Sequence, residues 1–420
     1  MIDLIKNYSI MARRMKKSVI RELLKLTLNP EIISFAGGLP DPEAFPIEEI
    51  DDIIHFVIKE HGKKAFQYGT TEGEMVLRNE LVKMAKANGE DIKPENLLVT
   101  VSSQQGLDLV GRVFLDPSDP ILVELPSYLG ALQAFKTYGA QMIGIPVDDD
   151  GIQTDLLETK LKKLRLEEEH YKFIYLVPDF QNPSGVSLST ERRREIIRLS
   201  KEFEVLIIED SPYRELRFEG ESPPTLFSMD TTGNIVSLHT FSKIFVPGLR
   251  LGWVVGHPKI ISKMTIAKQA VDLCTPGISQ FIAAEFCRRG LIWTHIDRVR
   301  SLYHKKRDLM LEALALYMPD VPGLRWTKPQ GGLFLWLVLP EEIDTEEMFY
   351  EAVENNVAYV IGSVFHCDGS GLNTMRLNFS FSTEDQIDAG IKRLAKVVKN
   401  KLSTGSYRGR AVEKHREYVN

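Results

Sequence analysis

The sequence predicts an α/β protein whose main domain holds a mostly parallel sheet between helices. Short, almost continuously apolar runs recur between residues 96 and 256, and amphipathic helical stretches separate most of them. Parallel strands are buried on both faces and therefore appear as near-continuous apolar runs, and their alternation with helices builds such a sheet. After residue 332 the pattern changes to an irregular mixture of strands and helices, which predicts a second, smaller α+β domain.

The N-terminal part is expected to precede the sheet. Apolar residues at helical spacing predict a first helix over 18–28, with Ser18 as a plausible N-cap. Residues 29–46 contain a Gly-Gly pair and several prolines, which is typical of a loop. Amphipathic helices are expected over 47–62 and 74–89, each closed by a glycine.

Strands and helices then follow each other along the chain. The expected strands are 96–101, 120–125, 141–147, 171–178, 204–210, 234–240 and 248–256. The expected helices are 102–115, 127–139, 154–170, 259–290 and 293–317. Beyond residue 332 we expect strands at 333–339, 357–362 and 374–380 and helices at 345–356 and 384–402.

These elements predict four units of the chain. Residues 1–45 form an N-terminal helix and loop that pack with the small domain and the substrate site. Residues 46–299 form the large α/β domain, and residues 300–402 form the small α+β domain. Residues 403–420 are polar and weakly patterned, so we expect a disordered tail.

Composition excludes several functional classes. The net charge of −6 argues against a general nucleic-acid binder. No apolar run is long enough to cross a membrane, and residues 1–17 lack the apolar segment of a signal peptide. The three cysteines stand far apart without metal-ligand spacing, as reduced thiols do. We therefore expect a cytoplasmic protein with no membrane or nucleic-acid partner and no metal.

The stretch 236–253 is the strongest candidate for a reactive site. It predicts a buried strand followed by a polar turn that contains Thr240, Ser242 and Lys243, and then by a loop that ends near Arg250. Ligands of open α/β sheets bind at the ends of strands. A lysine among hydroxyls and a guanidinium suits a Schiff-base nucleophile whose cofactor carries a phosphate, although a lone loop lysine is most often only solvated.

Polar residues follow other predicted strands. Asp210 ends a buried strand, where its carboxylate needs a cation such as a protonated pyridine nitrogen; a helix N-cap is the alternative. Tyr213 follows Asp210 closely. Asn182 is fixed in direction by the proline that follows it, or is simply a turn residue. Ser103 and Gln104 lie in the first turn of a predicted helix, which can bind phosphate or be merely capped.

Two further side chains are candidates for ligand contacts. Tyr128 follows a strand end and could stack on a flat cofactor, or belong to the core. Arg376 lies in an apolar strand, where a substrate carboxylate or an internal salt bridge would satisfy its guanidinium. Neither a dinucleotide-binding glycine motif nor a P-loop is present.

These segments, in this order, resemble the fold-type I, pyridoxal-phosphate-dependent aminotransferases of class I/II over about residues 15–402. The specific matches are PDFQNPSG, EDSPYREL, FSK…GLRLG and MRLNFS. The phrases SVIRELLKL, ISFAGGLPDPEAFP, QYGTTEG, SSQQGLDLVGRVFL and SYLGALQAF are most similar to the 2-aminoadipate/kynurenine group. The resemblance implies a large domain with a sheet of the seven-stranded type.

The resemblance also implies roles for individual residues. Lys243 would form the Schiff base with the cofactor and shuttle the substrate proton. Asp210 would pair with the pyridine nitrogen, and Asn182 and Tyr213 would bond the cofactor's 3′-oxygen. Tyr128 would stack on the ring. The phosphate would be held by Ser103, Gln104, Thr240, Ser242 and Arg250.

Substrate recognition and assembly are implied in the same way. Tyr68 would reach the phosphate from a neighbouring subunit, which makes the active unit a homodimer. Arg376 would bind the substrate α-carboxylate together with Asn182, Gly38 would line the substrate site, and Ser18 and Arg21 would read the substrate side chain. Ser102 departs from the family, which more often has glycine there, and Thr240 replaces a commoner serine.

The implied activity is transfer of an amino group from an L-amino acid to a 2-oxo acid such as 2-oxoglutarate in a ping-pong cycle. The expected donor is 2-aminoadipate, with glutamate, leucine and aromatic amino acids also open. A pyridoxal-phosphate-dependent β-lyase would keep the same cofactor residues and is the alternative. A transcription regulator with a transaminase-like module would need a basic winged-helix domain, and only residues 1–17 precede the first matched helix.

Overall fold

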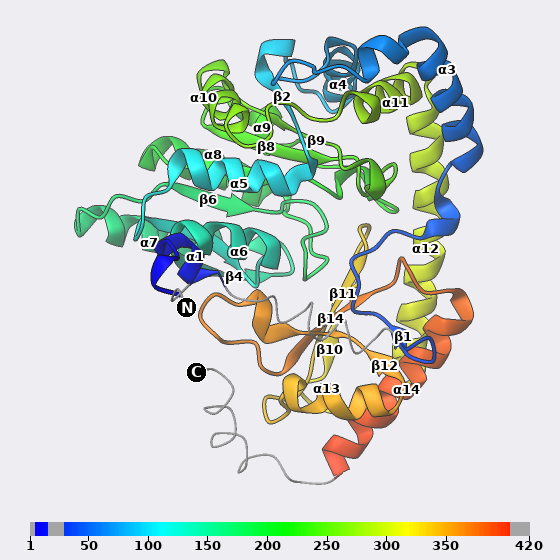
Figure 1. The fold of residues 1–420 in the computed structure, drawn as a ribbon. Helices are drawn as coiled ribbons and strands as arrows, with labels where there is room; N and C mark the ends of the chain where they lie inside the picture. Colours follow the sequence, from blue (N-terminus) through cyan, green and yellow to red (C-terminus); the bar gives the residue numbers. More distant parts are fainter. Residues whose placement is uncertain (1–4, 16–28, 404–420) are drawn as a thin grey trace.

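The computed structural model describes residues 5–15 and 29–403 and places two sheets beside each other (Figure 1). The large sheet has eight strands in the order β2-β9-β8-β7-β6-β3-β4-β5. Its strands are β2 (Leu97–Thr100), β3 (Pro120–Leu125), β4 (Gln141–Asp148), β5 (Gly151–Ile152), β6 (Phe173–Leu176), β7 (Leu206–Asp210), β8 (Ile235–Thr240) and β9 (Gly252–Val255).

Most of the large sheet is parallel, as the sequence predicts. The pairs β4–β3, β3–β6, β6–β7 and β7–β8 are parallel, whereas β9 runs antiparallel to both β8 and β2. The two-residue strand β5 adds an antiparallel edge. Nearly all side chains of the central strands are buried, which explains their continuous apolar sequence.

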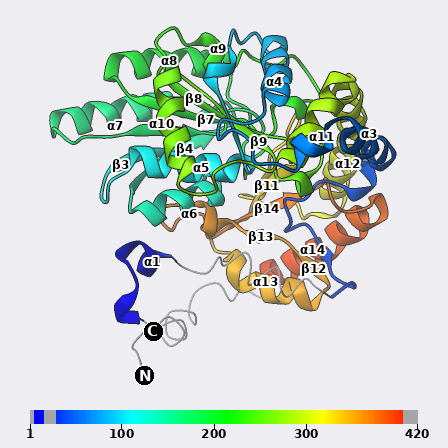
Figure 2. The same cartoon turned by 45° about the horizontal axis from the view of Figure 1, so that its top comes forward.

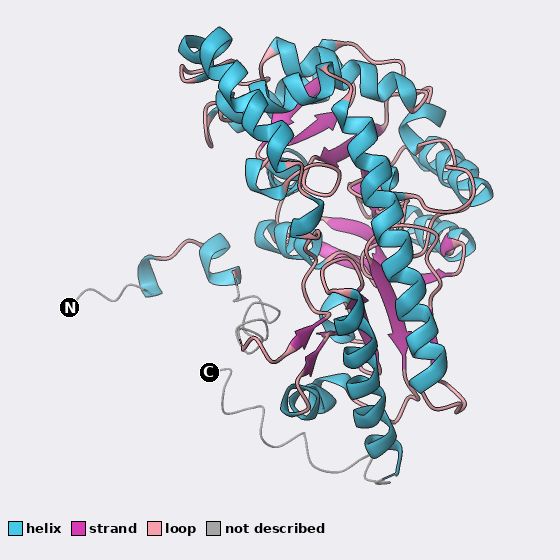
Figure 3. Cartoon of the chain, turned by 90° about the vertical axis from the view of Figure 1, so that its right-hand side faces the viewer, coloured by secondary structure: helices cyan, strands magenta, loops and turns pink. Residues whose placement is uncertain are grey.

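Helices surround this sheet (Figures 1 and 3). Those of the large region are α3 (Ile47–Ala65), α4 (Met75–Ala87), α5 (Ser102–Phe114), α6 (Leu129–Tyr138), α7 (Thr154–Leu166), α8 (Thr190–Phe203), α9 (Leu226–Met229), α10 (Pro258–Gln269) and α11 (Gly277–Arg288). The short helix α1 (Ile10–Arg14) contacts α6. At one end of the molecule α3 packs on α11, beside α12 (Leu291–Tyr317) (Figure 2).

The second sheet is antiparallel, in the order β10-β11-β14-β13. Its strands are β10 (Arg325–Trp326), β11 (Phe334–Val338), β13 (Val360–Ile361) and β14 (Thr374–Asn378), flanked by α13 (Thr345–Glu354) and α14 (Glu384–Ser403). Helix α12 extends from the large sheet to α14 (Figure 1). The boundary predicted near residue 300 falls inside this helix and stays a prediction.

The N-terminal loop joins the second region through a strand pair. Strand β1 (Ile33–Ser34) pairs in parallel with β12 (Val357–Ala358), and Phe35 donates and accepts backbone hydrogen bonds with Ala358 and Asn378. These bonds carry the loop 36–41 between the two sheets.

The structure differs from the sequence prediction in three longer elements, and the short elements α1, β1, β5, α9 and β10 were not predicted. The expected helix 259–290 is interrupted: α10 ends at Gln269, and Pro276, which has no backbone N–H to continue a helix, is the N-cap of α11. The expected strand 357–362 is split into β12 and β13, which pair with different strands. Helix α8, between β6 and β7, was not predicted from the sequence.

Two other expectations lie outside the described residues: the first helix over 18–28, and the tail beyond residue 403. Among the described helices none is long and apolar enough to cross a membrane.

Candidate active site

The predicted site residues converge between the two sheets, beyond the carboxyl ends of the parallel strands β6, β7 and β8. Asp210 is the last residue of β7, Lys243 follows β8, and Asn182 lies in the loop after β6. Arg376 comes from β14 of the second sheet, where it is paired with Trp336 and Val360. This is the edge at which open α/β sheets bind their ligands.

Lys243 reaches out of the large sheet to the N-terminal loop. Its Nζ donates to the carbonyl oxygen of Gly38 at 2.6 Å. Burial, together with the guanidinium groups of Arg376 and Arg250, lowers the pKa of Lys243 to about 8. A sizeable fraction of its amine is therefore neutral near physiological pH, as a nucleophile requires.

Asp210 is buried and has one polar partner. Its Oδ2 accepts a hydrogen bond of 2.9 Å from the hydroxyl of Tyr175, while its Oδ1 is buried without any partner among the described residues. Burial raises the pKa of Asp210 to about 7, and the hydrogen bond from Tyr175 opposes this shift. A buried carboxylate oxygen without a partner is costly, so Oδ1 is positioned for a ligand donor.

Asn182 connects Tyr213 with Arg376. Its Nδ2 donates to the Tyr213 hydroxyl at 3.1 Å, and its Oδ1 accepts from Arg376 Nη1 at 2.8 Å. All three side chains are buried. The two amide atoms of Asn182 are therefore held in fixed directions.

Arg376 has a polar side and an aromatic side. Its Nη2 donates to Ala36 O at 2.9 Å, and its guanidinium lies 4.2 Å from the ring centroid of Phe334 and 5.2 Å from that of Phe365. Its Nε has no partner among the described residues. No salt bridge of Arg376 is present in the described part of the chain, so the internal ion pair considered from the sequence is not found there.

A cluster of hydroxyls lies at the start of α5. Ser242 Oγ accepts from Thr240 Oγ1 at 2.9 Å, and Ser102 Oγ lies 3.4 Å from Thr240 Oγ1 and 3.5 Å from Ser242 Oγ. Backbone N–H groups at a helix start favour anions. The structure thus brings Thr240 and Ser242 to the first turn of the helix that contains Ser103.

Two backbone features allow this close approach. Ser102 has φ = 65°, a left-handed conformation that glycine adopts without strain, and this is the position at which the resembled family more often has glycine. At Gly252 of β9, a Cβ atom would lie 2.6 Å from Ser102 C and 2.7 Å from Ser103 N. Only glycine lets β9 pass so close to the start of α5.

Gln104 and Tyr128 line the neighbouring part of the site. Gln104 Nε2 donates to Gly130 O at 3.1 Å, and the Tyr128 hydroxyl donates to Gln104 Oε1 at 3.4 Å. Burial raises the pKa of Tyr128 to about 12. Its ring is therefore a neutral surface beside the carboxyl end of β3.

Two described site residues, Arg250 and Tyr68, form no hydrogen bond with this network, and two others lie outside the described residues. Arg250 is exposed, and its Nη1 donates to Pro247 O at 3.4 Å. Tyr68 is 80% exposed, and its predicted contact is with a second subunit. Ser18 and Arg21 lie outside the described residues.

These features fit pyridoxal phosphate. The free Oδ1 of Asp210 suits a protonated ring nitrogen, Tyr128 offers a ring for stacking, and the hydroxyls at the start of α5 suit the phosphate. Lys243, with its lowered pKa, supplies the amine. The residues that the structure brings together therefore match the donor set that this cofactor needs.

Three side chains of the site were missed in the sequence. Tyr175 contacts Asp210, Glu124 accepts from Val177 N at 2.9 Å near it, and Phe334 lies against Arg376. A tyrosine or glutamate inside an apolar strand needs a polar partner. That signal could have identified Tyr175 and Glu124, whereas nothing in the sequence distinguishes Phe334 from the core.

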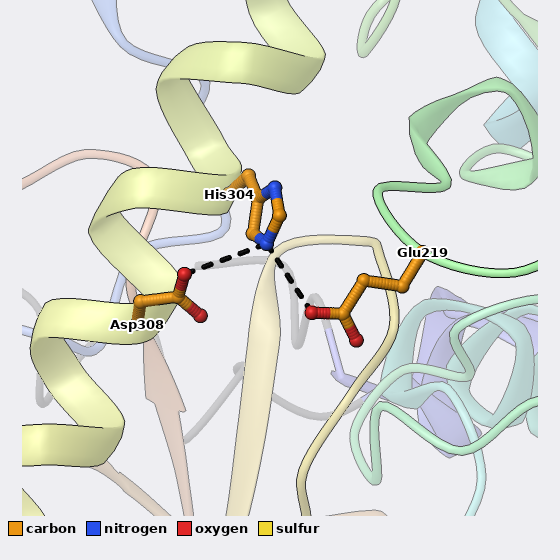
Figure 4. Close-up of side chains that lie close together, drawn as sticks. All are labelled: Glu219, His304 and Asp308. Carbon is orange, nitrogen blue, oxygen red and sulfur yellow. Dashed lines mark hydrogen bonds and ion pairs between the residues drawn. The ribbon is translucent and has the colours of Figure 1, made fainter.

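A separate group of potential metal ligands lies on the surface (Figure 4). His304 Nε2 is 3.2 Å from Glu219 Oε1 and 3.4 Å from Asp308 Oδ2. Arg307 forms ion pairs with both carboxylates, and its hydrogen bond holds the pKa of Glu219 below the ordinary value. These carboxylates already have a cation, so we assign no metal to them.

The chain matches a family of known proteins over most of its length. The family model "Aminotransferase class I and II" matches residues 33–394. The chain is 46% identical over 402 residues to aromatic-amino-acid aminotransferase 1 of Thermococcus litoralis, with 96% of each chain covered.

Two solved structures are similar over nearly the whole chain. Pyrococcus horikoshii kynurenine aminotransferase, in complex with PMP, has a TM-score of 0.92 and 46% identity, covering 95% of this chain and 98% of its own. LysN, the α-aminoadipate aminotransferase of Thermus thermophilus, in complex with N-(5′-phosphopyridoxyl)-L-leucine, has a TM-score of 0.88 and 38% identity, covering 96% of this chain and 100% of its own.

Proposed function

The chain belongs to the class I and II aminotransferases and uses pyridoxal phosphate, and on that basis we propose that it moves the amino group of 2-aminoadipate or of an aromatic L-amino acid to 2-oxoglutarate. The observation that supports this proposal is the arrangement of Lys243, Asp210 and Arg376 around one space between the two sheets. Relatives named for aromatic amino acids, kynurenine and α-aminoadipate support the choice of donors.

The cofactor supplies an electrophilic carbon and an electron-accepting ring. Around it, Lys243 would hold the cofactor through Nζ and would move the proton at the substrate Cα. Its lowered pKa suits both tasks, because the amine must be neutral to accept a proton. The Gly38 carbonyl holds Nζ on the side of the N-terminal loop.

The remaining residues orient the reactants. Asp210 would keep the ring nitrogen protonated, and Tyr128 would lie against the ring. Arg376 holds the donor's α-carboxylate. Asn182 fixes the positions of Arg376 and Tyr213 through one hydrogen bond to each. Burial of Asp210, Asn182 and Arg376 excludes water and strengthens each electrostatic contact.

The donor side chain is the finer part of the proposal. In this proposal Arg21, which lies outside the described residues, would pair with the second carboxylate of 2-aminoadipate, and an aromatic donor would not use this charge. One site therefore accepts both donors, provided that the N-terminal segment adjusts to them.

Replacing Arg21 by alanine tests the donor assignment. We expect kcat/KM for 2-aminoadipate to fall about 10- to 100-fold, as the loss of a hydrogen bond to a charged group implies, and kcat/KM for tyrosine to stay within about twofold. The measurement is steady-state kinetics with both donors and 2-oxoglutarate. Arg21→Lys is the matched variant, because it keeps the charge and loses the bidentate geometry.

The outcomes distinguish the donor from the reaction. Equal losses for both donors would contradict the role of Arg21 while leaving the aminotransferase intact. A wild-type protein that uses neither donor would contradict the donor class. Release of pyruvate and ammonia from a cysteine conjugate without a 2-oxo acid would favour the β-lyase instead.

The proposal includes a homodimer in which Tyr68 serves the partner's cofactor. Tyr68 is 80% exposed in the single chain and so lacks the burial expected of a binding residue. Exposed apolar side chains occur on the same N-terminal part of the large region, at Ile47, Ile58, Phe66 and Met75. Such exposure is typical of a surface that is covered in an assembly.

A further inference from the structure

The hydrogen bond from Tyr175 makes the two carboxylate oxygens of Asp210 different. Asp210 has two carboxylate oxygens in a fully buried setting, and they are not equivalent. Oδ2 accepts from the Tyr175 hydroxyl at 2.9 Å, and Oδ1 has no partner among the described residues. One oxygen is therefore anchored by the protein, and the other is available.

Tyr175 is held rigidly in the sheet. It lies on β6, where its backbone pairs with Ile208 of the adjacent strand β7, two residues before Asp210. Its side chain is fully buried and packs against the edge of Phe135, with ring centroids 5.5 Å apart and planes at 74°. A ring fixed in this way fixes the position of its hydroxyl.

The hydroxyl acts only as a donor to Asp210. Burial and the negative charge of Asp210 raise the pKa of Tyr175 well above its ordinary value, so the proton stays on the tyrosine. A donated hydrogen bond stabilises the ionised carboxylate more than the protonated one. The same bond favours one orientation of the carboxylate, with Oδ2 toward Tyr175.

We propose that Tyr175 is a positioning residue for the cofactor: its hydroxyl anchors Oδ2 of Asp210, keeps the carboxylate ionised and turns Oδ1 toward the pyridine nitrogen. This inference rests on the proposed role of Asp210 in the aminotransferase reaction. Tyr175 touches neither the substrate nor the reacting atoms and acts through Asp210 alone.

The electrostatic setting makes this bond important. The groups near Asp210 are Tyr175 on β6, Glu124 on β3, Tyr128 before α6, and Tyr213 after β7, and none of them is a cation. Burial raises the pKa of Asp210 to about 7 and that of Glu124 to about 8. Without the Tyr175 hydroxyl, Asp210 would be protonated over a wider pH range.

The test is binding of pyridoxamine 5′-phosphate to the cofactor-free protein at a series of pH values. This probe has the ring nitrogen and the phosphate but forms no bond with Lys243. If the protonated ring binds only ionised Asp210, affinity falls as the pH drops below the pKa of Asp210 in the free protein. For the wild type, a plot of log Kd against pH should therefore change its slope near pH 7.

Tyr175→Phe removes the hydroxyl and keeps the ring. A hydrogen bond to an ionised group shifts a pKa by about one to two units. The pH at which the slope changes should therefore rise by that amount, and the Kd at pH 7 should rise roughly 10-fold. Tyr359→Phe is the matched control: Tyr359 is also fully buried, and its hydroxyl donates to Thr345 O at 2.6 Å, away from this site. Its binding curve should match the wild type.

Asp210→Asn supplies a second and independent readout. In that background the added Tyr175→Phe change should alter the Kd by less than about twofold, because the group through which Tyr175 acts is gone. A Tyr175→Phe protein whose pH curve coincides with that of the wild type would overturn the proposal. Equal effects of Tyr175→Phe in the two backgrounds would also overturn it, since they would show a general packing effect.

The proposal and the aminotransferase function fail in different ways. If Tyr175→Phe binds the probe as the wild type does, with the same dependence of Kd on pH, only the positioning role of Tyr175 is contradicted. The assigned role of Asp210 would also be contradicted if wild-type binding of the probe did not change with pH near 7 and Asp210→Asn did not change the Kd.

Discussion

Replacing Lys243 by alanine is expected to abolish turnover with every amino donor, reducing kcat by about 10⁴-fold or more. The reason is that one amine both binds the cofactor and carries the substrate proton, and loss of a general base alone costs about 10²–10⁴-fold. The lowered pKa of Lys243 and its contact with Gly38 O single it out among the lysines described here. Steady-state rates and the visible absorbance of the purified variant, with added pyridoxal phosphate, measure both roles.

The fold should survive this change, because a partly buried lysine is replaced by a smaller side chain at the end of a loop. Lys259→Ala, at an exposed position of α10, is the matched control and should keep wild-type activity and absorbance. A Lys243→Ala protein that retains turnover above about 1% of the wild-type rate would contradict the assignment, because a lost base costs at least about 10²-fold.

Replacing Arg376 by alanine is expected to lower kcat/KM by about 30- to 3,000-fold for all amino donors alike. Every donor has an α-carboxylate, and truncating one partner of a buried, hydrogen-bonded charge pair costs about 2–5 kcal/mol. The effect should appear mainly as a higher KM, because the contact exists before the chemical step. Kinetics with 2-aminoadipate, glutamate, leucine and tyrosine measure whether the loss is uniform.

Two controls separate recognition of the carboxylate from a change in packing. Arg376→Lys keeps the charge but not the bidentate geometry, so its loss should be intermediate. An amine without a carboxylate, such as tyramine, should react equally poorly with the wild type and with Arg376→Ala. Donor-dependent losses, or an unchanged KM, would show that another cation binds the carboxylate.

The chemistry of the site was more predictable than its supporting contacts. Lys243, Asp210, Asn182 and Arg376 stand out in the sequence because each is a polar residue at or within an apolar strand or beside a strand end. Parallel strands bring their carboxyl ends to one edge, so the alternation of strands and helices already implies that these side chains meet.

Contacts across strands could not be derived in the same way. The bond from Tyr175 to Asp210 depends on the register between β6 and β7, which apolar runs do not encode because every position in them is buried. The link from Asn182 to Arg376 joins the two sheets and depends on how the second sheet docks. The break between α10 and α11 was signalled by Pro276, but the apolar pattern continues on both sides of it.

Ser102 shows what a departure from a family pattern can mean. In the resembled family glycine is commoner at this position. The structure shows that Ser102 adopts the left-handed conformation with φ = 65° and that its hydroxyl joins Thr240 and Ser242. The position keeps the backbone shape of a glycine turn and adds a hydroxyl to the cluster.

The most direct test of the central claim is a half-reaction followed by visible absorbance. The purified protein with bound pyridoxal phosphate is mixed with L-2-aminoadipate or L-tyrosine in the absence of a 2-oxo acid. We expect the visible band of the cofactor to disappear as the amine form accumulates, with one 2-oxo acid formed per site, and to return when 2-oxoglutarate is added. A band that persists with both donors and with glutamate and leucine would contradict amino transfer from these donors.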